Sequence, residues 1–579
     1  MAEGLRKAAD QGRSSPLGAQ GKRHPPVRSQ RHREGKGLRT IDVSFGTILE
    51  AVAEAVPDRI AISTPDSEYT YAQFEERSAR LATALQQSGV AAGDTVACYL
   101  YNSAAYLETV FAAFKIGAVP VNANYRYTGS ELASLLTDAD AHALVYSDQL
   151  AANVDGIVDA VPTLAVALRA GGKTVGSATG DDLDGVIAAH PPLPQAPRPG
   201  TDTLFMYTGG TTGRPKGVIW RHRDLLHSLA VPVYRPVGRD LPTTIADAVD
   251  AAREASVRGM VPVTMPVVPL MHATGLFNTI GTMLLGGTVV LADPGGLDPS
   301  RVWSIVQDKH VKTIIVAGNA VCSPLIDELT RSETDGQPYD LSSLRTVLSS
   351  GTAFSDHLKQ SLHERADVTI IDAIGSSEGG PFVFATTSSI DDLPAKFFPV
   401  PATKVFDEHD NEVLPGSGTT GVLAYSGPSP LGYYKDEGKT ALTFRVIGGV
   451  RYSLPGDFVE VHEDGSIRFL GRQSGVINTG GEKVHPQEVE DVLLTHPDVR
   501  DCVVVGAPDP KWGEQVAAVV AIDAASTVTE EDLQYWVRQE LAGYKVPRTV
   551  VLLDRLPRTP TGKIEISWAK QQVTMMSAQ

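Results

Sequence analysis

The stretch that decides the fold is TLFMYTGGTTGRPKG, residues 203–217, where an apolar run leads into a loop of glycines, threonines and cations. The run TLFMY is typical of a buried strand. The loop can present backbone N–H groups and hydroxyls to phosphate oxygens, and Arg214 and Lys216 add positive charge. It is not a Walker A loop, because Pro215 precedes the lysine and Gly217 follows it where Ser or Thr is required. We therefore expect a strand and a phosphate-binding loop, and a P-loop NTPase is disfavoured.

Helical and strand patterns alternate outward from this loop. Before it, apolar spacing predicts helices at 44–55, 70–88 and 107–116, the last ending at Gly117, and strands at 94–100 and 119–124. After it, the alternation resumes with strands at 288–292, 313–318 and 346–351 and a helix near 300–309. Such alternation is typical of largely parallel sheets. The sequence predicts an α/β fold with two α/β lobes.

Two further regions follow, each with a different sequence pattern. Between about 400 and 470, short strands separated by turn residues predict a small β-rich subdomain, and Asp464-Gly465 is typical of a hairpin. After Gly471, helices beginning near Pro486 and Thr529 alternate with strands, as in a compact α+β domain. We expect a disordered basic tail at 1–39, a large domain at 40–473 and a mobile C-terminal lid domain at 474–579.

Charge is divided unevenly along the 579 residues. The net charge is −17, yet residues 1–39 hold ten Lys and Arg against three acidic residues, a balance of +7 that leaves −24 for the rest. A body this acidic is a poor binder of nucleic acid, which needs a basic surface. The tail lacks the apolar segment of a secretory signal, so a transit peptide and an extended start of translation both stay open.

Composition also bounds the class of protein. No run approaches the roughly 18 apolar residues of a transmembrane helix, although peripheral membrane contact stays possible. Cys98, Cys322 and Cys502 lie far apart, which disfavours a disulfide scaffold or a structural zinc site and favours a reducing compartment. We expect a cytoplasmic protein. The sequence leaves the oligomeric state open, with a homodimer as one outcome.

Several ordered motifs resemble those of the adenylate-forming (ANL) superfamily, and the resemblance covers about 45–570. TGGTTGRPKG resembles the family's phosphate loop, and later motifs follow in the family's order: PLMHATG (269–275), SSGTAF (349–354), GSSEG (375–379), YSLPGD (452–457), GRQSGVINTGGEKVHPQEVE (471–490) and PRTPTGK (557–563). The combined motifs are most similar to actinobacterial FadD-type synthetases, which activate fatty acids or steroid side-chain acids. Ile374 departs from the pattern, because many relatives place an aromatic residue there against adenine.

The resemblance implies roles for individual residues. Those that would bind ATP are Thr208, Gly209, Gly210, Thr211, Thr212 and Lys216 at the phosphates, Gly351, Thr352 and Ala353 along the adenine, Asp457 with Arg472 at the ribose, and Ser377 in the GSSEG motif, which keeps a hydroxyl where Thr is common. Glu378, with Thr208, would hold Mg²⁺, a hard cation that accepts a lone carboxylate and keeps several waters. Gly480 and Gly481 would face the channel for CoA, and His272 would lie near the acid's carboxylate.

Lys563 is the main candidate for catalysis. A carboxylate that attacks the α-phosphate brings two negative charges together, and a lysine between them would position both and stabilise that charge. In the family the small domain rotates between the two half-reactions, and by resemblance its hinge is Ser474.

The sequence thus predicts an ATP-dependent acyl-CoA synthetase that forms an acyl-adenylate and then a CoA thioester. Apolar residues in 231–280 and 317–322 suit a hydrophobic acid: Val263, Met265, Val267, Leu270, Phe277 and Val321. Two alternatives stay open at this point. One is an acyl-AMP ligase that loads a carrier protein, and the other is a non-catalytic sensor of acyl ligands, which the intact Lys216, Glu378, Asp457 and Lys563 disfavour.

Overall fold

The run TLFMY forms strand β8 (Thr203–Thr208) in the computed structural model, which describes residues 41–171, 180–208, 215–229, 233–472, 475–479, 482–509, 511–523, 526–559 and 563–577. β8 pairs in parallel with β4 (Val119–Asn122) and antiparallel with β9 (Lys216–Arg221). Within the described residues its sheet has the order β19-β9-β8-β4-β3-β5-β6-β7. The remaining strands are β3 (Thr95–Tyr99), β5 (Ala141–Ser147), β6 (Val166–Ala170), β7 (Asp181–Asp182) and β19 (Gly432–Tyr433).

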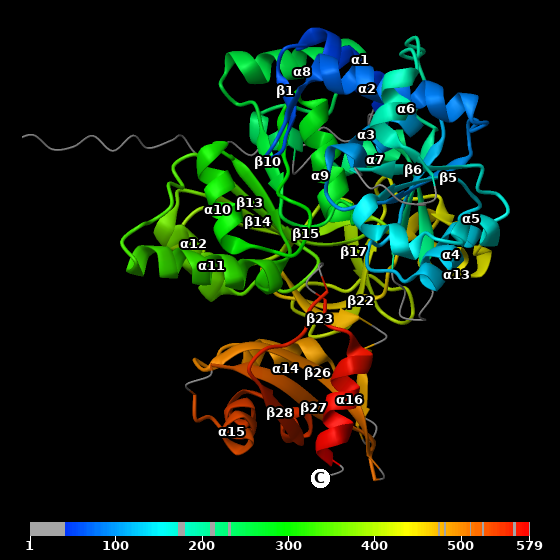
Figure 1. Ribbon diagram of the computed structural model, residues 1–579. Coiled ribbons are helices and arrows are strands. Elements are labelled where there is room, and N and C mark those ends of the chain that lie inside the picture. The colour runs from blue at the N-terminus through cyan, green and yellow to red at the C-terminus, as the bar shows by residue number, and fades with distance from the viewer. Residues whose placement is uncertain are drawn as a thin grey trace, which may run out of the picture. The chain divides into compact units, whose positions relative to one another are not determined.

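A second, longer sheet has the order β16-β15-β14-β13-β12-β10-β11-β1-β2 and is parallel from β14 to β1. Its strands are β1 (Ile60–Ser63), β2 (Glu68–Thr70), β10 (Val263–Pro266), β11 (Thr288–Val290), β12 (Thr313–Val316), β13 (Thr346–Ser350), β14 (Thr369–Ser376), β15 (Gly380–Thr387) and β16 (Phe398–Pro399). These two sheets are the two predicted α/β lobes (Figure 1). The predicted fold class is confirmed.

Helices pack between and around the two sheets (Figure 1). They are α1 (Phe45–Ala55), α2 (Tyr71–Gln87), α3 (Ala104–Ile116), α4 (Gly129–Asp138), α5 (Ile157–Ala160), α6 (Leu183–Ala189), α7 (His222–Ser228), α8 (Ile245–Val257), α9 (Ala273–Leu284), α10 (Pro299–Asp308), α11 (Gly318–Thr334) and α12 (Asp356–Arg365). One helix begins earlier than the predicted 107–116, because the side chain of Ser103 accepts a hydrogen bond from the Tyr106 N–H and caps α3. Gly117 ends α3 with φ 71°, as predicted.

The predicted β-rich subdomain is an antiparallel sheet. It contains β17 (Thr403–Phe406), β18 (Thr420–Tyr425), β20 (Phe444–Ile447), β21 (Val450–Ser453), β22 (Asp457–Val461) and β23 (Ile467–Arg472), and α13 (Glu437–Thr443) precedes β20. β22 and β23 form the hairpin expected at Asp464-Gly465, and Gly465 has φ 81°. This hairpin places Asp457 opposite Arg472 in register.

The C-terminal residues form a separate mixed sheet with its own helices. Its strands are β24 (Ile477–Thr479), β25 (Glu482–Val484), β26 (Val499–Asp509), β27 (Gly513–Ile522) and β28 (Thr549–Leu553), and its helices are α14 (Pro486–Leu493), α15 (Glu530–Glu540) and α16 (Ile566–Ser577). The long β26 and β27 are antiparallel, and β28 pairs with β27 in parallel. The core of this α+β domain is separate from the cores of the two lobes.

The three cysteines are buried and free. Burial raises the thiol pKa of each of them. In the part of the chain that the structure describes, no helix is both long enough and apolar enough to span a bilayer.

Candidate active site

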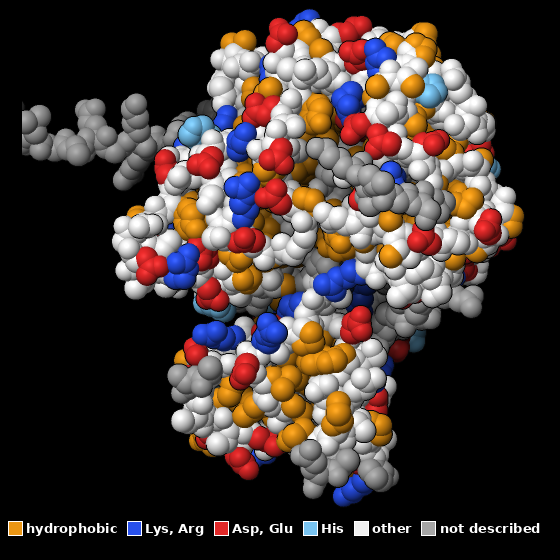
Figure 2. All heavy atoms as spheres, viewed as in Figure 1, with side chains coloured by type: hydrophobic (Ala, Val, Ile, Leu, Met, Phe, Trp, Pro, Cys, Tyr) orange, Lys and Arg blue, Asp and Glu red, His pale blue; other side chains and the backbone are white. Residues whose placement is uncertain are grey.

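A large cleft collects residues from both lobes, the β-rich subdomain and the C-terminal domain. Its volume is about 3180 Å³, and it is lined by the ends of β8, β13 and β14, by the start of α9 and by residues around Lys563. The space-filling view shows a hollow above the C-terminal domain, with Lys and Arg side chains gathered at its border (Figure 2). A cleft of this kind can hold a large anionic substrate.

The predicted phosphate loop is framed by a hairpin. Thr208 ends β8 and lines the cleft, and Lys216 begins β9 opposite Thr208 in register. Lys216 forms an ion pair with Asp436, whose carboxylate also accepts the Lys439 N–H and so caps α13. Among the predicted phosphate ligands, Gly209, Gly210, Thr211 and Thr212 lie outside the described residues.

Glu378 lies in the turn between β14 and β15, where three side chains fix its surroundings. The Tyr433 hydroxyl donates to Glu378 Oε1 at 2.8 Å, and the Ser453 hydroxyl donates to the Glu378 carbonyl at 2.7 Å. The Trp220 indole donates to the carbonyl of Ser377, a predicted ATP-binding residue, at 2.8 Å. The Glu378 carboxylate is therefore held at the wall of the cleft, which Thr208 also lines.

These oxygen donors fit Mg²⁺ in kind. No cluster of three or more His, Cys, Asp or Glu side chains that could form a metal cage occurs among the described residues. Mg²⁺ prefers one or two carboxylates together with phosphate oxygens and water, so one carboxylate and one hydroxyl from the chain suit it.

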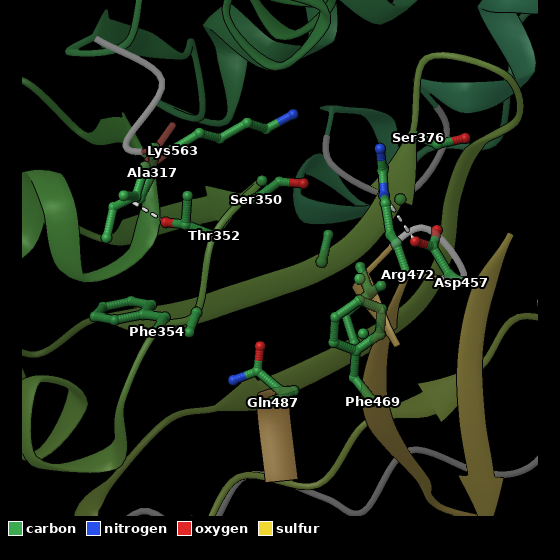
Figure 3. A pocket seen from close by; sticks show the side chains of 18 of the residues that line it. Ala317, Ser350, Thr352, Phe354, Ser376, Asp457, Phe469, Arg472, Gln487 and Lys563 are labelled. Carbon is green, nitrogen blue, oxygen red and sulfur yellow. Dashed lines mark hydrogen bonds and ion pairs between the residues drawn. The ribbon is translucent and has the colours of Figure 1, made fainter. Parts of the chain in front are cut away.

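Asp457 and Arg472 form the ion pair set up by the β22–β23 hairpin. Arg472 Nε lies 3.0 Å from Asp457 Oδ1. A dashed line joins the two side chains in Figure 3. Asp457 is 1% exposed, and its Oδ2 is buried without a hydrogen-bond partner among the described residues. Burial raises the pKa of this carboxyl. A buried acceptor without a partner is costly, so a ligand hydroxyl that donates to it would be bound favourably.

The predicted adenine loop follows β13. The Thr352 hydroxyl donates to the Ala317 carbonyl at 3.0 Å, and Figure 3 labels both residues. Gly351 has φ 99°, and the Ala353 carbonyl accepts the Asn319 N–H at 2.8 Å. These bonds tie the loop to the start of α11. Both Thr352 and Ala353 line the cleft.

Beneath this loop lies a buried ion pair that the sequence analysis missed. Lys359 Nζ lies 2.9 Å from Asp372 Oδ2, and the two residues are 2% and 4% exposed. The Lys359 ammonium also lies over the ring of Phe354, 5.2 Å from its centroid. Asp372, at the start of DAIGSSEGG, could have been noticed from the sequence. Its partner Lys359 is thirteen residues earlier and lies in no recognisable motif.

His272 and Lys563 bring the N-terminal and C-terminal halves of the site together. Burial, aided by the nearby Lys563 charge, lowers the pKa of His272 to about 3. Burial lowers the pKa of Lys563 too, helped by Arg472 and opposed by Glu378 and Asp457. Figure 3 shows the Lys563 side chain extended in the pocket.

The backbone at Lys563 is fixed by Thr559. The Lys563 N–H donates to the Thr559 hydroxyl at 3.1 Å, and the Thr559 N–H donates to the Lys563 carbonyl at 2.8 Å. The predicted CoA-channel residues Gly480 and Gly481 and the predicted hinge Ser474 lie outside the described residues.

The residues expected to wall the acid pocket are mostly elsewhere. Phe277 lines the cleft, but Val263, Met265, Val267, Leu270 and Val321 are absent from its described lining. They pack instead into or against the lobe cores. Val263 and Met265 do so because they lie in β10, a parallel strand that is covered on both faces and needs apolar residues there. Other residues missed by sequence reasoning are Tyr433 and Asp436, in the segment GYYKDE (432–437).

The fold is that of an α/β enzyme, and one cleft is lined by residues of both its N-terminal and its C-terminal parts. The AMP-binding enzyme family matches residues 49–434, and the AMP-binding enzyme C-terminal domain matches residues 488–563. The chain belongs to the AMP-binding enzyme family.

Relatives of known name are similar to this chain over most of its length. A medium/long-chain-fatty-acid–CoA/3-oxocholest-4-en-26-oate–CoA ligase of Mycobacterium marinum is 38% identical, over 92% of this chain and 97% of the relative. A 3-oxocholest-4-en-26-oate–CoA ligase of Rhodococcus rhodochrous is 37% identical, over 93% and 97%. The crystal structure of an anthranilate CoA ligase with anthranoyl-AMP is 24% identical, with a TM-score of 0.78 over 93% of this chain and 99% of that one, and supports the fold.

Proposed function

We propose that the protein is an ATP-dependent acyl-CoA synthetase that activates a hydrophobic carboxylic acid, a fatty acid or a steroid side-chain acid. The observation that carries the proposal is the meeting of Lys563 with Glu378, Asp457, Arg472 and His272 at one cleft. The names of the Mycobacterium marinum and Rhodococcus rhodochrous relatives support the class of acid and the use of CoA.

In the first half-reaction, an oxygen of the acid's carboxylate attacks the α-phosphorus of ATP and pyrophosphate leaves. Lys563 contacts the carboxylate and the α-phosphate and stabilises the charge that concentrates between them. His272, which its low pKa keeps neutral, lies beside the carboxylate and adds no second positive charge. Lys216, freed from Asp436, binds the phosphates together with the loop residues Thr208, Thr211 and Thr212.

The nucleoside part of ATP is held on the opposite side. Asp457 accepts hydrogen bonds from the ribose hydroxyls through Oδ2, the oxygen that has no partner in the described structure. Arg472 donates to the other oxygen, Oδ1. The loop Gly351–Thr352–Ala353 packs along the adenine. Glu378 and Thr208 hold Mg²⁺, which neutralises phosphate charge when bound.

In the second half-reaction, the CoA sulfur attacks the acyl carbon, AMP leaves and the thiol proton passes to solvent. The small domain rotates about the proposed hinge at Ser474 before this step. Gly480 and Gly481 then face the pantetheine channel. We propose further that the protein acts in the cytoplasm and that any contact with membranes is peripheral.

The test is release of pyrophosphate and AMP from ATP and Mg²⁺, with and without CoA. The acids are acetate, benzoate, medium and long fatty acids and a steroid side-chain acid. We expect turnover to AMP that depends on CoA and favours the apolar acids. Pyrophosphate release that CoA does not accelerate would overturn the CoA ligase and indicate an acyl-AMP ligase for a carrier protein.

A further inference from the structure

One wall of the cleft is a face of helix α9. His272, Ala273, Thr274, Phe277 and Asn278 line the cleft, with the i, i+3, i+4 spacing that places side chains on one helical face. Since His272 lies near Lys563, this wall leads away from the reacting end of the cleft. Asn278 is six residues beyond His272, about 9 Å along the helix at 1.5 Å per residue.

Asn278, in this wall, carries a hydrogen-bond acceptor that has no partner among the described residues. Its Nδ2 donates to the Thr274 carbonyl at 2.7 Å, which fixes the orientation of the side-chain amide. Its Oδ1 is buried and has no hydrogen-bond partner among the described residues. A buried acceptor without a partner is unfavourable unless a ligand supplies a donor.

Ser228, at the end of α7, contributes a second polar group to the same cleft. Its hydroxyl is also buried, and no residue in the described ranges bonds to it. The backbone approaches it closely at Gly380, where an added Cβ would lie 2.7 Å from Ser228 Oγ. A serine hydroxyl can either donate or accept, so it can pair with the oxygen of a ligand hydroxyl.

The wall closes one helical turn further on. A Cβ added at Gly281 would lie 2.4 Å from Val233 Cγ2, so α9 and the Val233 segment touch there. Asn278 therefore lies near the far end of the wall, beside the hydrocarbon body of a bound acid and not beside its carboxylate.

We propose that the preferred acid carries a hydroxyl on its hydrocarbon body, about 9 Å from the carboxylate along this wall. The hydroxyl donates to Asn278 Oδ1, and Ser228, which lines the same cleft, is tested as a second polar group. A ligand carbonyl fits less well, because it cannot donate to Asn278. The inference rests on the proposed acyl-CoA synthetase activity, and it concerns hydroxylated fatty acids and hydroxylated steroid side-chain acids alike.

The experiment compares kcat/KM for CoA-dependent AMP release between hydroxylated acids and their parents. One arm is a series of hydroxyalkanoic acids of one chain length that differ in hydroxyl position, and the other is a steroid side-chain acid with and without a ring hydroxyl. We expect the natural protein to prefer the hydroxylated acid at least 10-fold at one hydroxyl position, since a pocket built to bond a hydroxyl rejects the analogue lacking it.

The Asn278→Leu variant should lose this preference or reverse it, while retaining activity on the parent acid. Ser228→Ala should reduce the preference by a smaller factor. Thr279→Val is the matched control, because Thr279 lies on the same helix, is 0% exposed and is absent from the described cleft lining. It should leave the preference unchanged.

Equal kcat/KM for every hydroxylated acid and its parent would overturn the inference, as would a preference that survives in Asn278→Leu. Those outcomes leave the acyl-CoA synthetase intact, because the parent acids still turn over. Failure of every acid, hydroxylated or not, to give CoA-dependent AMP release would overturn the proposed function itself.

Discussion

At the scale of single residues, the proposed role of Lys563 predicts that the two half-reactions depend on it to different degrees. Thr559 fixes the lysine backbone. Burial and the charge of Arg472 lower the pKa of the Lys563 ammonium group, and the charges of Glu378 and Asp457 raise it. We expect Lys563→Ala to lower the rate of adenylate formation by about 10²–10³-fold, as removal of a group that stabilises developing charge does elsewhere. Transfer from supplied acyl-AMP to CoA should fall much less. An equal loss in both half-reactions, measured by pyrophosphate and thioester release, would contradict the assignment.

His222 gives a prediction about stability and pH. It is 1% exposed, accepts the Phe45 N–H through Nδ1 at 3.2 Å and stacks on the Phe45 ring. Burial lowers its pKa from 6.5 to about 3, so the unfolded chain binds a proton that the folded chain does not, and stability is lost as pH falls below 6.5. At pH 5 the loss is about 2 kcal/mol.

The variant His222→Asn keeps an acceptor near Nδ1 but cannot titrate. Its stability should be lower at pH 7.5, because the ring stacking is gone, yet it should lose less on acidification than the natural protein. Urea unfolding at pH 7.5 and pH 5.0 measures both changes. An acid-induced loss of the same size in both proteins would show that His222 does not carry it.

The sequence predicted site residues where a motif carries them. Asp457 and Arg472, which lie in two motifs, do meet as an ion pair, and Thr352 and Glu378 do line the same cleft. Lys359, Asp436 and Asn278 could not be predicted in this way. Lys359 and Asp436 each form an ion pair with a residue that is not beside them in sequence, and Asn278 is placed by the shape of the cleft. Neither kind of feature leaves a local sequence pattern.

At the scale of elements, α11 couples the adenine loop to the second lobe. Gly318 begins the helix with φ 44°, and a Cβ there would lie 2.1 Å from the Ala353 carbonyl oxygen. We expect Gly318→Ala to displace the adenine loop and raise KM for ATP, in addition to lowering stability. The matched control is Gly336→Ala just beyond the other end of α11, where φ is 71° and nothing lies within 4 Å of the added Cβ.

The control should lower the melting temperature through backbone strain and leave KM for ATP unchanged. Steady-state kinetics over a range of ATP concentrations, with thermal unfolding of both variants, separates the two effects. Identical KM values for the two variants would mean that α11 does not position the loop.

Elements with strong local signals were predicted well. The helix at 70–88 has a capping box between Thr70 and Gln73, and the hairpin at Asp464-Gly465 has its turn glycine at positive φ. The pairing order of the strands could not be predicted, because β1 pairs with β11 across more than 200 residues and nothing local records it. The same gap explains why apolar residues of β10 were assigned to the acid pocket instead of the lobe core.

At the scale of the whole molecule, the proposed function assigns two chemical steps to one cleft and predicts that the small domain rotates between them. The predicted hinge is Ser474, which lies outside the described residues. We expect Ser474→Pro to restrict the backbone there, sparing adenylate formation while reducing thioester formation at least 10-fold. Single-turnover assays of each half-reaction measure this. A variant that keeps both rates would place the hinge elsewhere.

The buried cysteines have a consequence for the reactive intermediate. An acyl-adenylate acylates any accessible thiolate, and the attacking species is the thiolate and not the thiol. Cys98, Cys322 and Cys502 are buried, and their raised pKa keeps them protonated at neutral pH. The enzyme's own sulfur atoms are thus protected from self-acylation, and the activated acyl group is preserved for the incoming CoA.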